Sequence, residues 1–454
     1  MKTLSFLFAF VLLFSGICRA ETPVVAWIRN YSPSAGGLAA HYVAVDTAGR
    51  IATTGVRLNP GLPVDLDMRT ARYSSSGKLK WQSFTESIGI YIDYPTGLSF
   101  DRAGNVVIVG QVRSPADGFS QAMYTAKFAQ RDGSFLWQNA YDNLGAANED
   151  IARGVTVDRF NQIVVTGDSG RFNSGVTDCV TIKYNPNGFE LWTVRSGTHS
   201  ANSPDMGASP SAVATDNVGD VVIVGRTRLD DIYAAKYQNM TGALLWETSL
   251  SEPLDSLQSA FDVEVDSSQN AVYLCGEVRL NGNTSPSDGF VARLNKDTGA
   301  TVWKKFLAGP NNGSDRLFRI AVDRDHNVIV AGKFFNGIDY DFYVAKLSKR
   351  NGSVIWKRQI DGPSKRDDEL SGLALDPSGN PVLTGYCNGA NGNFFAFTVK
   401  CSNANGATMW SERLGGRIAT GLAIDKQGNI FVSGFGEGPN TTTVAFLLKY
   451  VMQP

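Results

Sequence analysis

Residues 318–358 read FRIAVDRDHNVIVAGKFFNGIDYDFYVAKLSKRNGSVIWKR. Short apolar runs alternate with turns rich in Asp, Asn and Gly, and the stretch closes on a tryptophan. The same pattern recurs along the chain, with one tryptophan in each copy: Trp27, Trp81, Trp137, Trp192, Trp246, Trp303, Trp356 and Trp410. Their spacing of 53 to 57 residues indicates an array of identical supersecondary units, none of which buries its apolar face alone.

Each unit contains the pattern of four short strands. In the quoted stretch they are expected at residues 318–322, 328–332, 341–347 and 353–358, because runs of Val, Ile, Phe and Tyr separated by polar turns are typical of a strand meander. Four antiparallel strands of about 5–6 residues make one blade of a β-propeller. The sequence therefore predicts an all-β, eight-bladed propeller of four-stranded antiparallel blades.

The two ends of the chain are expected to complete one another. The last unit begins at Gly421 and reaches Tyr450, but it has neither a fourth strand nor a tryptophan. Residues 24–28, which contain Trp27, precede the first complete unit. We predict that this N-terminal strand completes the last blade and closes the ring, which removes an exposed sheet edge.

The charge balance and the N-terminal sequence indicate where the protein is located and which classes of partner are not expected. Forty-two basic against 43 acidic residues give no basic excess, so nucleic acid binding is not expected. Lys2, the apolar run 4–17 and the small residue Ala20 predict a secretory signal peptide over residues 1–20, followed by a single domain over residues 21–454. No later segment is apolar enough to span a membrane. We expect a secreted or periplasmic monomer.

Two residue types recur in every unit, and we interpret both as structural. The tryptophan is expected to wedge between blades, with its indole N–H on a carbonyl. An aspartate ends the first strand, where it can accept backbone N–H groups of the turn and lie near the basic residue of the third strand. These aspartates are Asp46, Asp101, Asp158, Asp216, Asp266, Asp323, Asp376 and Asp425.

The connections of the units fall into two groups. The turns after the first and third strands are short and uniform, so they form one structural face. The loops after the second strand and the crossovers to the next unit vary, and they gather on the opposite face. Function is expected on that variable face, because binding residues concentrate in variable loops held by a rigid scaffold.

Acidic residues in the crossovers are the candidate binding residues. They can supply hard oxygen ligands for Ca²⁺, or polar contacts for a saccharide or peptide, at the mouth of the central channel. Alternatively they cap crossover turns or pair with Arg153, Arg316 and Arg319. The set is Asp93, Asp150, Asp205, Asp255, Asp315 and Asp368.

A second acidic set lies before the third strand, at Asp67, Asp178, Asp231, Asp288 and Asp341. Arginines just beyond the second strand, at Arg57, Arg113, Arg171, Arg228 and Arg279, are expected to pair with them. Such exposed pairs explain both sets without a ligand, at about 0–1 kcal/mol each.

The sequence offers little for catalysis. The cysteines Cys179, Cys275, Cys387 and Cys401 occupy strand positions and are expected as single buried thiols. No nucleophile elbow and no zinc-ligand spacing is found. We therefore expect a binding protein rather than an enzyme.

Two family resemblances follow from these residues. Residues 288–299, together with 320–323 and 330–332, resemble the bacterial secreted β-propeller repeat of the SBBP type, over nearly the whole mature chain. This resemblance implies an exported bacterial protein without a general assigned activity. Residues 297–303 resemble the tryptophan-docking motif of eight-bladed quinoprotein dehydrogenases. The adjacent cysteine pair of many of those enzymes is absent, so pyrroloquinoline quinone is not expected.

Taken as a whole, the sequence predicts an exported scaffold that binds a protein or glycan partner on its variable face, with no cofactor and with Ca²⁺ as the one candidate ion. The alternative is a quinoprotein-like dehydrogenase, or a propeller hydrolase or lyase, that uses acidic residues at the mouth of the channel.

Overall fold

The computed structural model describes residues 22–31, 37–59, 65–85, 92–114, 120–142, 148–171, 177–196, 209–227, 230–250, 258–279, 286–311, 313–362, 364–389, 392–438 and 442–453. The predicted signal peptide and the candidates Asp205 and Asp255 lie outside these residues. The one described helix is a short 3₁₀ turn, η1 (Ser267–Gln269), and no described helix has the length and apolar character needed to span a membrane.

The described strands form eight blades. The strands of the first four blades are β2 (Leu38–Val45), β3 (Ile51–Leu58), β4 (Leu66–Tyr73) and β5 (Leu79–Thr85); β6 (Tyr94–Phe100), β7 (Val106–Arg113), β8 (Gln121–Phe128) and β9 (Phe135–Tyr141); β10 (Asn148–Val157), β11 (Ile163–Arg171), β12 (Thr177–Tyr184) and β13 (Glu190–Ser196); and β14 (Ser209–Thr215), β15 (Val221–Arg226), β16 (Ile232–Tyr237) and β17 (Leu244–Leu250).

The strands of the last four blades are β18 (Gln258–Asp266), β19 (Ala271–Val278), β20 (Asp288–Asn295) and β21 (Thr301–Leu307); β22 (Arg316–Val322), β23 (Val328–Phe335), β24 (Tyr340–Leu347) and β25 (Val354–Ile360); β26 (Asp368–Leu375), β27 (Pro381–Asn388), β28 (Phe394–Cys401) and β29 (Thr408–Gly415); and β30 (Arg417–Ile424), β31 (Ile430–Glu437), β32 (Thr443–Gln453) and β1 (Thr22–Tyr31).

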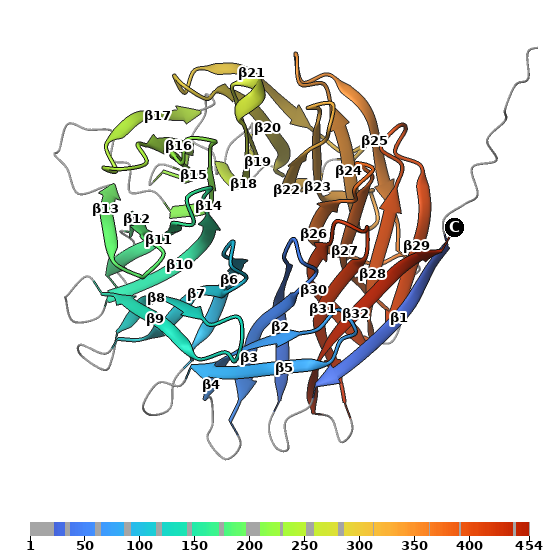
Figure 1. The fold of residues 1–454 in the computed structure, drawn as a ribbon. Coiled ribbons are helices and arrows are strands. Elements are labelled where there is room, and N and C mark those ends of the chain that lie inside the picture. Colours follow the sequence, from blue (N-terminus) through green and yellow to red (C-terminus); the bar gives the residue numbers. More distant parts are fainter. Residues whose placement is uncertain are drawn as a thin grey trace, which may run out of the picture.

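Within each blade, neighbouring strands are antiparallel, and they follow chain order in all blades but the eighth, where β1 pairs with β32. Figure 1 shows the sheets arranged around a common axis, with the first strand of each nearest the centre. A single parallel bridge between Gln121 and Glu149 links the second and third blades. The predicted all-β propeller is confirmed.

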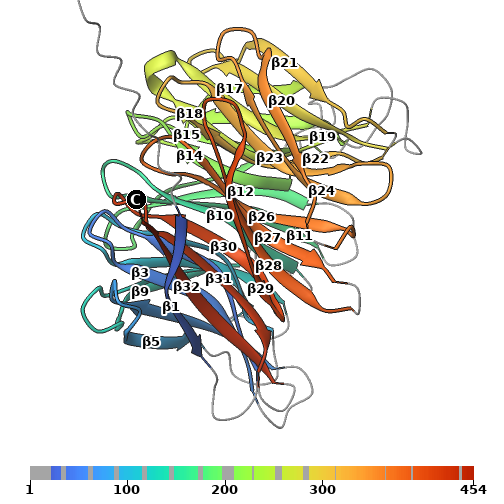
Figure 2. The same cartoon turned by 90° about the vertical axis from the view of Figure 1, so that its right-hand side faces the viewer.

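The ring closes as predicted. Strand β1 pairs antiparallel with β32, from Thr22 opposite Gln453 to Tyr31 opposite Ala445. Figures 1 and 2 both show this N-terminal strand beside the C-terminal one, on the rim of the last blade. The eighth blade is therefore built from both ends of the chain.

Tryptophans lock each blade to the next. Trp303 Nε1 donates to the Lys349 carbonyl at 3.2 Å, and the indole covers Gly352, whose φ of 69° and missing side chain allow the contact. Seven tryptophans bond to the next blade in this way, and their carbonyl acceptors are those of Ser75, Gln130, Pro186, Asn239, Lys296, Lys349 and Asn403. The predicted indole–carbonyl contact is thus seen at seven of the eight positions.

Trp410 is the exception. Its indole N–H is buried and has no acceptor among the described residues. The reason is topological: the third and fourth strands of the eighth blade are β32 and β1, so no turn joins them to offer a glycine and a carbonyl.

Apolar cores lie between the blades. Between the fourth and fifth blades, for example, Val222 and Ile232 pack with Leu274 and Phe290, and all four are fully buried. The four cysteines are also buried and free, as predicted.

Candidate functional site

The turns after the first and third strands form one face of the ring, which we call the turn face. The loops after the second strand and the crossovers between blades lie at the other ends of the same strands, and we call that side the crossover face. Contacts between turns of successive blades, such as Lys127 Nζ to the Pro186 carbonyl at 2.9 Å, tie the turn face together.

Ion pairs hold the repeated aspartates of the turn face. Lys183 Nζ lies 2.9 Å from Asp158 Oδ2, and both side chains are fully buried. The equivalent pairs join Lys127 to Asp101, Lys236 to Asp216, Lys346 to Asp323 and Lys400 to Asp376, at 2.7 to 2.9 Å. The contacts of these five aspartates agree with their predicted structural role.

The lysines also set the protonation of these carboxyls. Burial alone would raise the pKa of Asp101, but hydrogen bonds from Lys127 and Asn105 outweigh it and hold that pKa below its usual value. The pKa of Asp216 is lowered in the same way by Lys236. These carboxylates stay ionised and neutralised by the chain itself.

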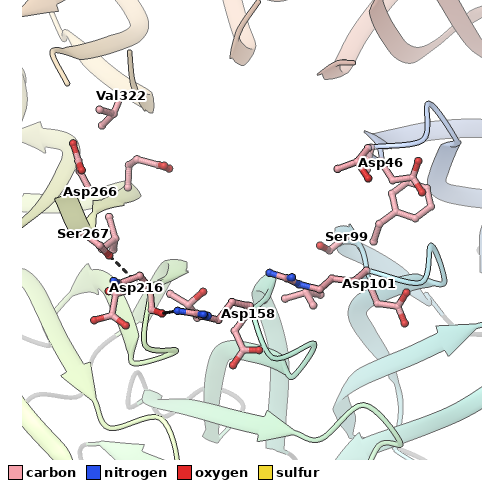
Figure 3. Close-up of a pocket in the computed structure, with 18 of the residues that line it drawn as sticks. Asp46, Ser99, Asp101, Asp158, Asp216, Asp266, Ser267 and Val322 are labelled. Carbon is pink, nitrogen blue, oxygen red and sulfur yellow. Dashed lines mark hydrogen bonds between the residues drawn. The ribbon is translucent and has the colours of Figure 1, made fainter. Parts of the chain in front are cut away.

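A cavity of about 1100 Å³ opens at the turn-face end of the central channel. It is lined by the ends of the first strands and by the turns that follow them. Figure 3 shows the carboxylates of Asp101, Asp158 and Asp216 pointing away from the opening and into the blades. Asp101, Asp158 and Asp216 therefore lie around this cavity, but their carboxylates are directed away from it.

Glu264 breaks the symmetry of the cavity wall. It stands two residues before the repeated aspartate of the fifth blade, and its side chain is exposed to the cavity. In the other seven blades this position holds a small residue: Ala44, Ser99, Thr156, Ala214, Ala321, Ala374 and Ala423. One long ionisable side chain therefore projects from a ring of small ones.

The surroundings of Glu264 are acidic. Although the side chain is exposed to the water of the channel, the enclosing wall lowers the solvation of the carboxyl and raises its pKa to about 7, and the nearby carboxylates of Asp262 and Asp266 act in the same direction. Asp262 accepts the Ile320 backbone N–H at 3.0 Å, and Asp266 Oδ2 lies 2.7 Å from His326 Nδ1. Among the described residues no cation pairs with Glu264.

Further into the channel the wall becomes mixed in charge. Arg319 opposes the rise that burial imposes on the pKa of Asp262. Arg319 and Arg153 both act on Tyr42, whose pKa is raised mainly by burial. The first strands thus carry basic, acidic and aromatic side chains, and the mouth of the channel carries Arg102 and Arg159 besides Glu264.

The described crossover acids are buried. Asp93, Asp150, Asp315 and Asp368 are at most 1% exposed. Asp315 accepts the backbone N–H groups of Gly309 and Phe335, and Asp368 accepts that of Gly362 at 2.7 Å. Burial raises the pKa of Asp315 to about 6 and that of Asp368 to about 7. They sit inside the crossovers rather than on an open rim, and their predicted role in binding stays a prediction.

Of the two alternative structural roles expected for these acids, the hydrogen bonds of Asp315 and Asp368 to backbone N–H groups correspond to the capping of crossover turns. Two of the arginines named as alternative partners form other ion pairs: Arg153 pairs with Asp168 of its own blade at 2.7 Å, and Arg316 pairs with Glu277 of the preceding blade at 2.8 Å.

The second acidic set is partnered in different ways. Arg57 pairs with Asp67, as predicted. Asp178 pairs with Arg195 of the fourth strand at 2.6 Å, and the side chain of its predicted partner Arg171 lies outside the described residues. Asp341 instead gathers with two further carboxylates in a cluster at the crossover face.

Fold and cavity together define a closed eight-bladed β-propeller with a polar central channel. Residues 177–400, just under half of the chain, match the family described as outer membrane protein assembly factor BamB. No curated protein matches the chain.

Solved structures share this architecture. BamB from Moraxella catarrhalis is 13% identical, with 93% of this chain and 99% of that one covered, at a TM-score of 0.50. Quinohemoprotein alcohol dehydrogenase from Comamonas testosteroni is 9% identical, with 94% and 76% covered, at 0.57. Sqt1 from Chaetomium thermophilum, bound to the N-terminus of the ribosomal protein L10, is 12% identical, with 92% and 98% covered, at 0.56. At these identities the likeness concerns the fold, and the SBBP-type resemblance stays a prediction.

That no pyrroloquinoline quinone binds in this cavity stays a prediction, since the wall carries the cations Arg102 and Arg159 as well as the carboxyl of Glu264. Glu264 was not among the residues singled out from the sequence. The signal that reveals it is the alignment of the eight units, in which it is the one charged residue at its position.

Proposed function

We propose that the chain is an exported β-propeller scaffold that binds a partner protein and holds a cationic group of that partner in the turn-face cavity. The observation that carries the proposal is Glu264, an unpaired carboxyl in a ring of small residues. A lysine, arginine or N-terminal amine placed there would relieve the repulsion from Asp262 and Asp266.

The dimensions of the cavity support this proposal. About 1100 Å³ is enough for an extended peptide segment rather than a single side chain. Sqt1, which shares the fold, binds the N-terminus of another protein. Because the proposed ligand group is cationic, we favour a protein partner over a glycan. The proposed binding site then lies on the turn face, whereas the sequence predicted binding on the variable face.

Export rests on the predicted signal peptide over residues 1–20, and the similarity to BamB supports it. The ring offers the rigidity that such a scaffold needs, because both chain ends are tied into one blade.

A titration with pentalysine tests the proposal. At pH 8, where Glu264 is ionised, calorimetry on the mature chain is expected to detect pentalysine binding and no binding of pentaglutamate. Glu264→Gln should weaken pentalysine binding at least about tenfold, because a close charge pair is worth on the order of 1.5 kcal/mol or more.

Asp325→Asn is the matched control, since Asp325 is an exposed acid on the same face outside the cavity. Binding should weaken as the pH is lowered from 8 to 6, because Glu264 titrates at about 7. Equal affinities of the wild type and Glu264→Gln would refute the assignment.

A hydrolase or lyase is the second candidate, for one reason. A carboxyl with a pKa near 7 is suited to donate and accept protons at neutral pH. Turnover of a panel of peptides and oligosaccharides that disappears in Glu264→Gln would favour this candidate over the scaffold.

A further inference from the structure

Three carboxylates converge on the crossover face at the boundary between the sixth and seventh blades. Asp339 and Asp341 lie at the start of β24, and Asp361 directly follows β25. One carboxylate oxygen of each lies within 4.8 Å of the others. Asp339 and Asp341 are 5% and 3% exposed, whereas Asp361 is exposed. The cluster therefore has a buried floor and one open side.

Two oxygens in the floor lack a donor of normal geometry. The Asn336 amide donates to Oδ1 of Asp339 and, at 3.0 Å, to Oδ2 of Asp341. The remaining oxygens, Asp339 Oδ2 and Asp341 Oδ1, are buried and accept no hydrogen bond of normal geometry, while the Gln359 side chain lies close enough to Asp341 to oppose the rise of its pKa. Buried anionic oxygens without a partner are strongly unfavourable, so this arrangement calls for a positive charge.

In the first blade a similar pair of buried aspartates is neutralised by a cation of the chain itself. There the Asn59 amide donates to Asp65 at 2.8 Å and to Asp67 at 2.7 Å, as Asn336 does in the sixth blade. In addition, Arg57 stands opposite Asp67 in the sheet and pairs with it. The same motif therefore carries a built-in cation in the first blade.

In the sixth blade this cation is missing. The residue opposite Asp341 is Phe334, which is fully buried and stacked on Tyr343 with ring centroids 3.6 Å apart. The adjacent Lys333 is bonded to Glu369 at 2.6 Å. An apolar residue therefore stands opposite Asp341, as Val278 stands opposite Asp288 in the fifth blade, and in the sixth blade Asp361 adds a third carboxylate.

Two cations lie near the cluster. Lys365 acts on Asp361, and Lys365 and Arg366 line a pocket together with Asp339, but both side chains are exposed and neither forms an ion pair with the three carboxylates among the described residues. Asp368, fully buried, lies close enough to Asp341 and Asp361 to interact with both, and it adds negative charge. The buried carboxylates of the cluster thus carry an excess of negative charge that the nearby cations do not pair with directly.

We propose that Asp339, Asp341 and Asp361 bind a divalent cation, with Ca²⁺ as the best match. Three carboxylates supply hard oxygen ligands, and waters entering past Asp361 complete the coordination that Ca²⁺ accepts in flexible geometry. Mg²⁺ fits less well, because it demands a near-ideal octahedron and gives up its waters reluctantly. The affinity expected for an extracellular module is a Kd on the order of 10⁻⁴–10⁻³ M.

A calcium titration of the metal-free mature chain tests this site directly. Calorimetry should show one saturable equivalent of Ca²⁺ per chain. Asp341→Asn is expected to abolish that binding, and Asp361→Asn to weaken it at least about tenfold. Glu437→Gln should leave binding unchanged, since Glu437 is an exposed acid on the same face at the end of β31.

Thermal unfolding separates loss of binding from loss of fold. In EDTA, Asp341→Asn should be at least as stable as the wild type, because it removes one of several repelling buried charges. Added Ca²⁺ should raise the Tm of the wild type and leave that of Asp341→Asn unchanged.

Two results would overturn the proposal. One is the absence of saturable binding or of a Tm rise up to about 10 mM Ca²⁺, well above the expected Kd. The other is a Lys365→Met variant that binds Ca²⁺ when the wild type does not, which would show that this lysine is the counter-ion of the cluster. The proposal is independent of Glu264, which lies on the opposite face.

Discussion

The two faces of the ring treat their buried carboxylates in opposite ways. On the turn face, lysines lower the pKa of Asp101, Asp216 and Asp376 in spite of burial. On the crossover face, burial raises the pKa of Asp315 and Asp341 to about 6. The lysines of the turn face neutralise its repeated aspartates, and Glu264 is the unpaired exception there. On the crossover face, Asp315 and Asp341 are buried where the structure describes no cation paired with them, which costs stability.

The lysine pairs also explain why the turn face is uniform. Lys183 Nζ contacts not only Asp158 but also the Gly219 carbonyl at 2.9 Å and the Asn239 side chain, both in the next blade. Each pair therefore ties a blade to its neighbour. A change in any one turn would disturb two blades, so these turns have little freedom to vary.

The largest effect is expected from breaking such a pair. Lys183→Met should lower the free energy of unfolding by about 3–5 kcal/mol, because it leaves Asp158 buried and charged without its partner. Urea unfolding followed by tryptophan fluorescence measures this loss. The double variant Lys183→Met/Asp158→Asn should recover much of the stability. A single-variant loss below about 1 kcal/mol would mean that the pairs do not stabilise the turn face.

The crossover face should show the opposite dependence on charge. Asp315 has a folded-state pKa of about 6, above an unfolded value near 3.9, so the folded state binds more protons between these pH values. Stability contributed by this group is therefore full below about pH 4 and is lost as the pH rises to about 6, by roughly 2–3 kcal/mol.

The measurement compares unfolding free energies of the wild type and Asp315→Asn between pH 4 and 7. The difference between the two curves isolates Asp315 from the other titrating groups. The stability of the wild type relative to Asp315→Asn should fall with pH between about pH 4 and 6 and stay constant above pH 6. A slope of the opposite sign would show that Asp315 is stabilised as an anion.

The repeated residues made most of the fold predictable. One tryptophan per unit gave the number of blades, and the missing fourth strand after Tyr450 gave the closure by β1. These features are predictable because each repeats a local pattern whose packing partner is the next copy of itself.

The sites were less predictable, because they are departures from the repeat. Glu264 is a single exception at a position where the other blades carry small residues, and the role of Phe334, at a variable position, depends on the aspartate that faces it in the next strand. Asp339 and Asp361 are brought together by two connections about twenty residues apart. The crossover acids were identified, but their burial follows from how the crossovers fold back on the blade, which the sequence pattern does not encode.

The smallest expected effect concerns the one irregular position of the turn face. Trp303 and Trp410 are buried to the same extent, at 8% and 7% exposed, but only Trp303 donates its indole N–H to a carbonyl of the next blade. Trp303→Phe loses that hydrogen bond, at about 1 kcal/mol beyond the packing loss, while the Lys349 carbonyl keeps the hydrogen bond that it accepts from Arg293 at 2.8 Å. Trp410→Phe loses the same packing and removes a buried donor that had no partner, so its cost should be smaller by about that amount. Urea unfolding of the two variants gives the comparison, and equal losses would mean that an acceptor from outside the described residues reaches Trp410.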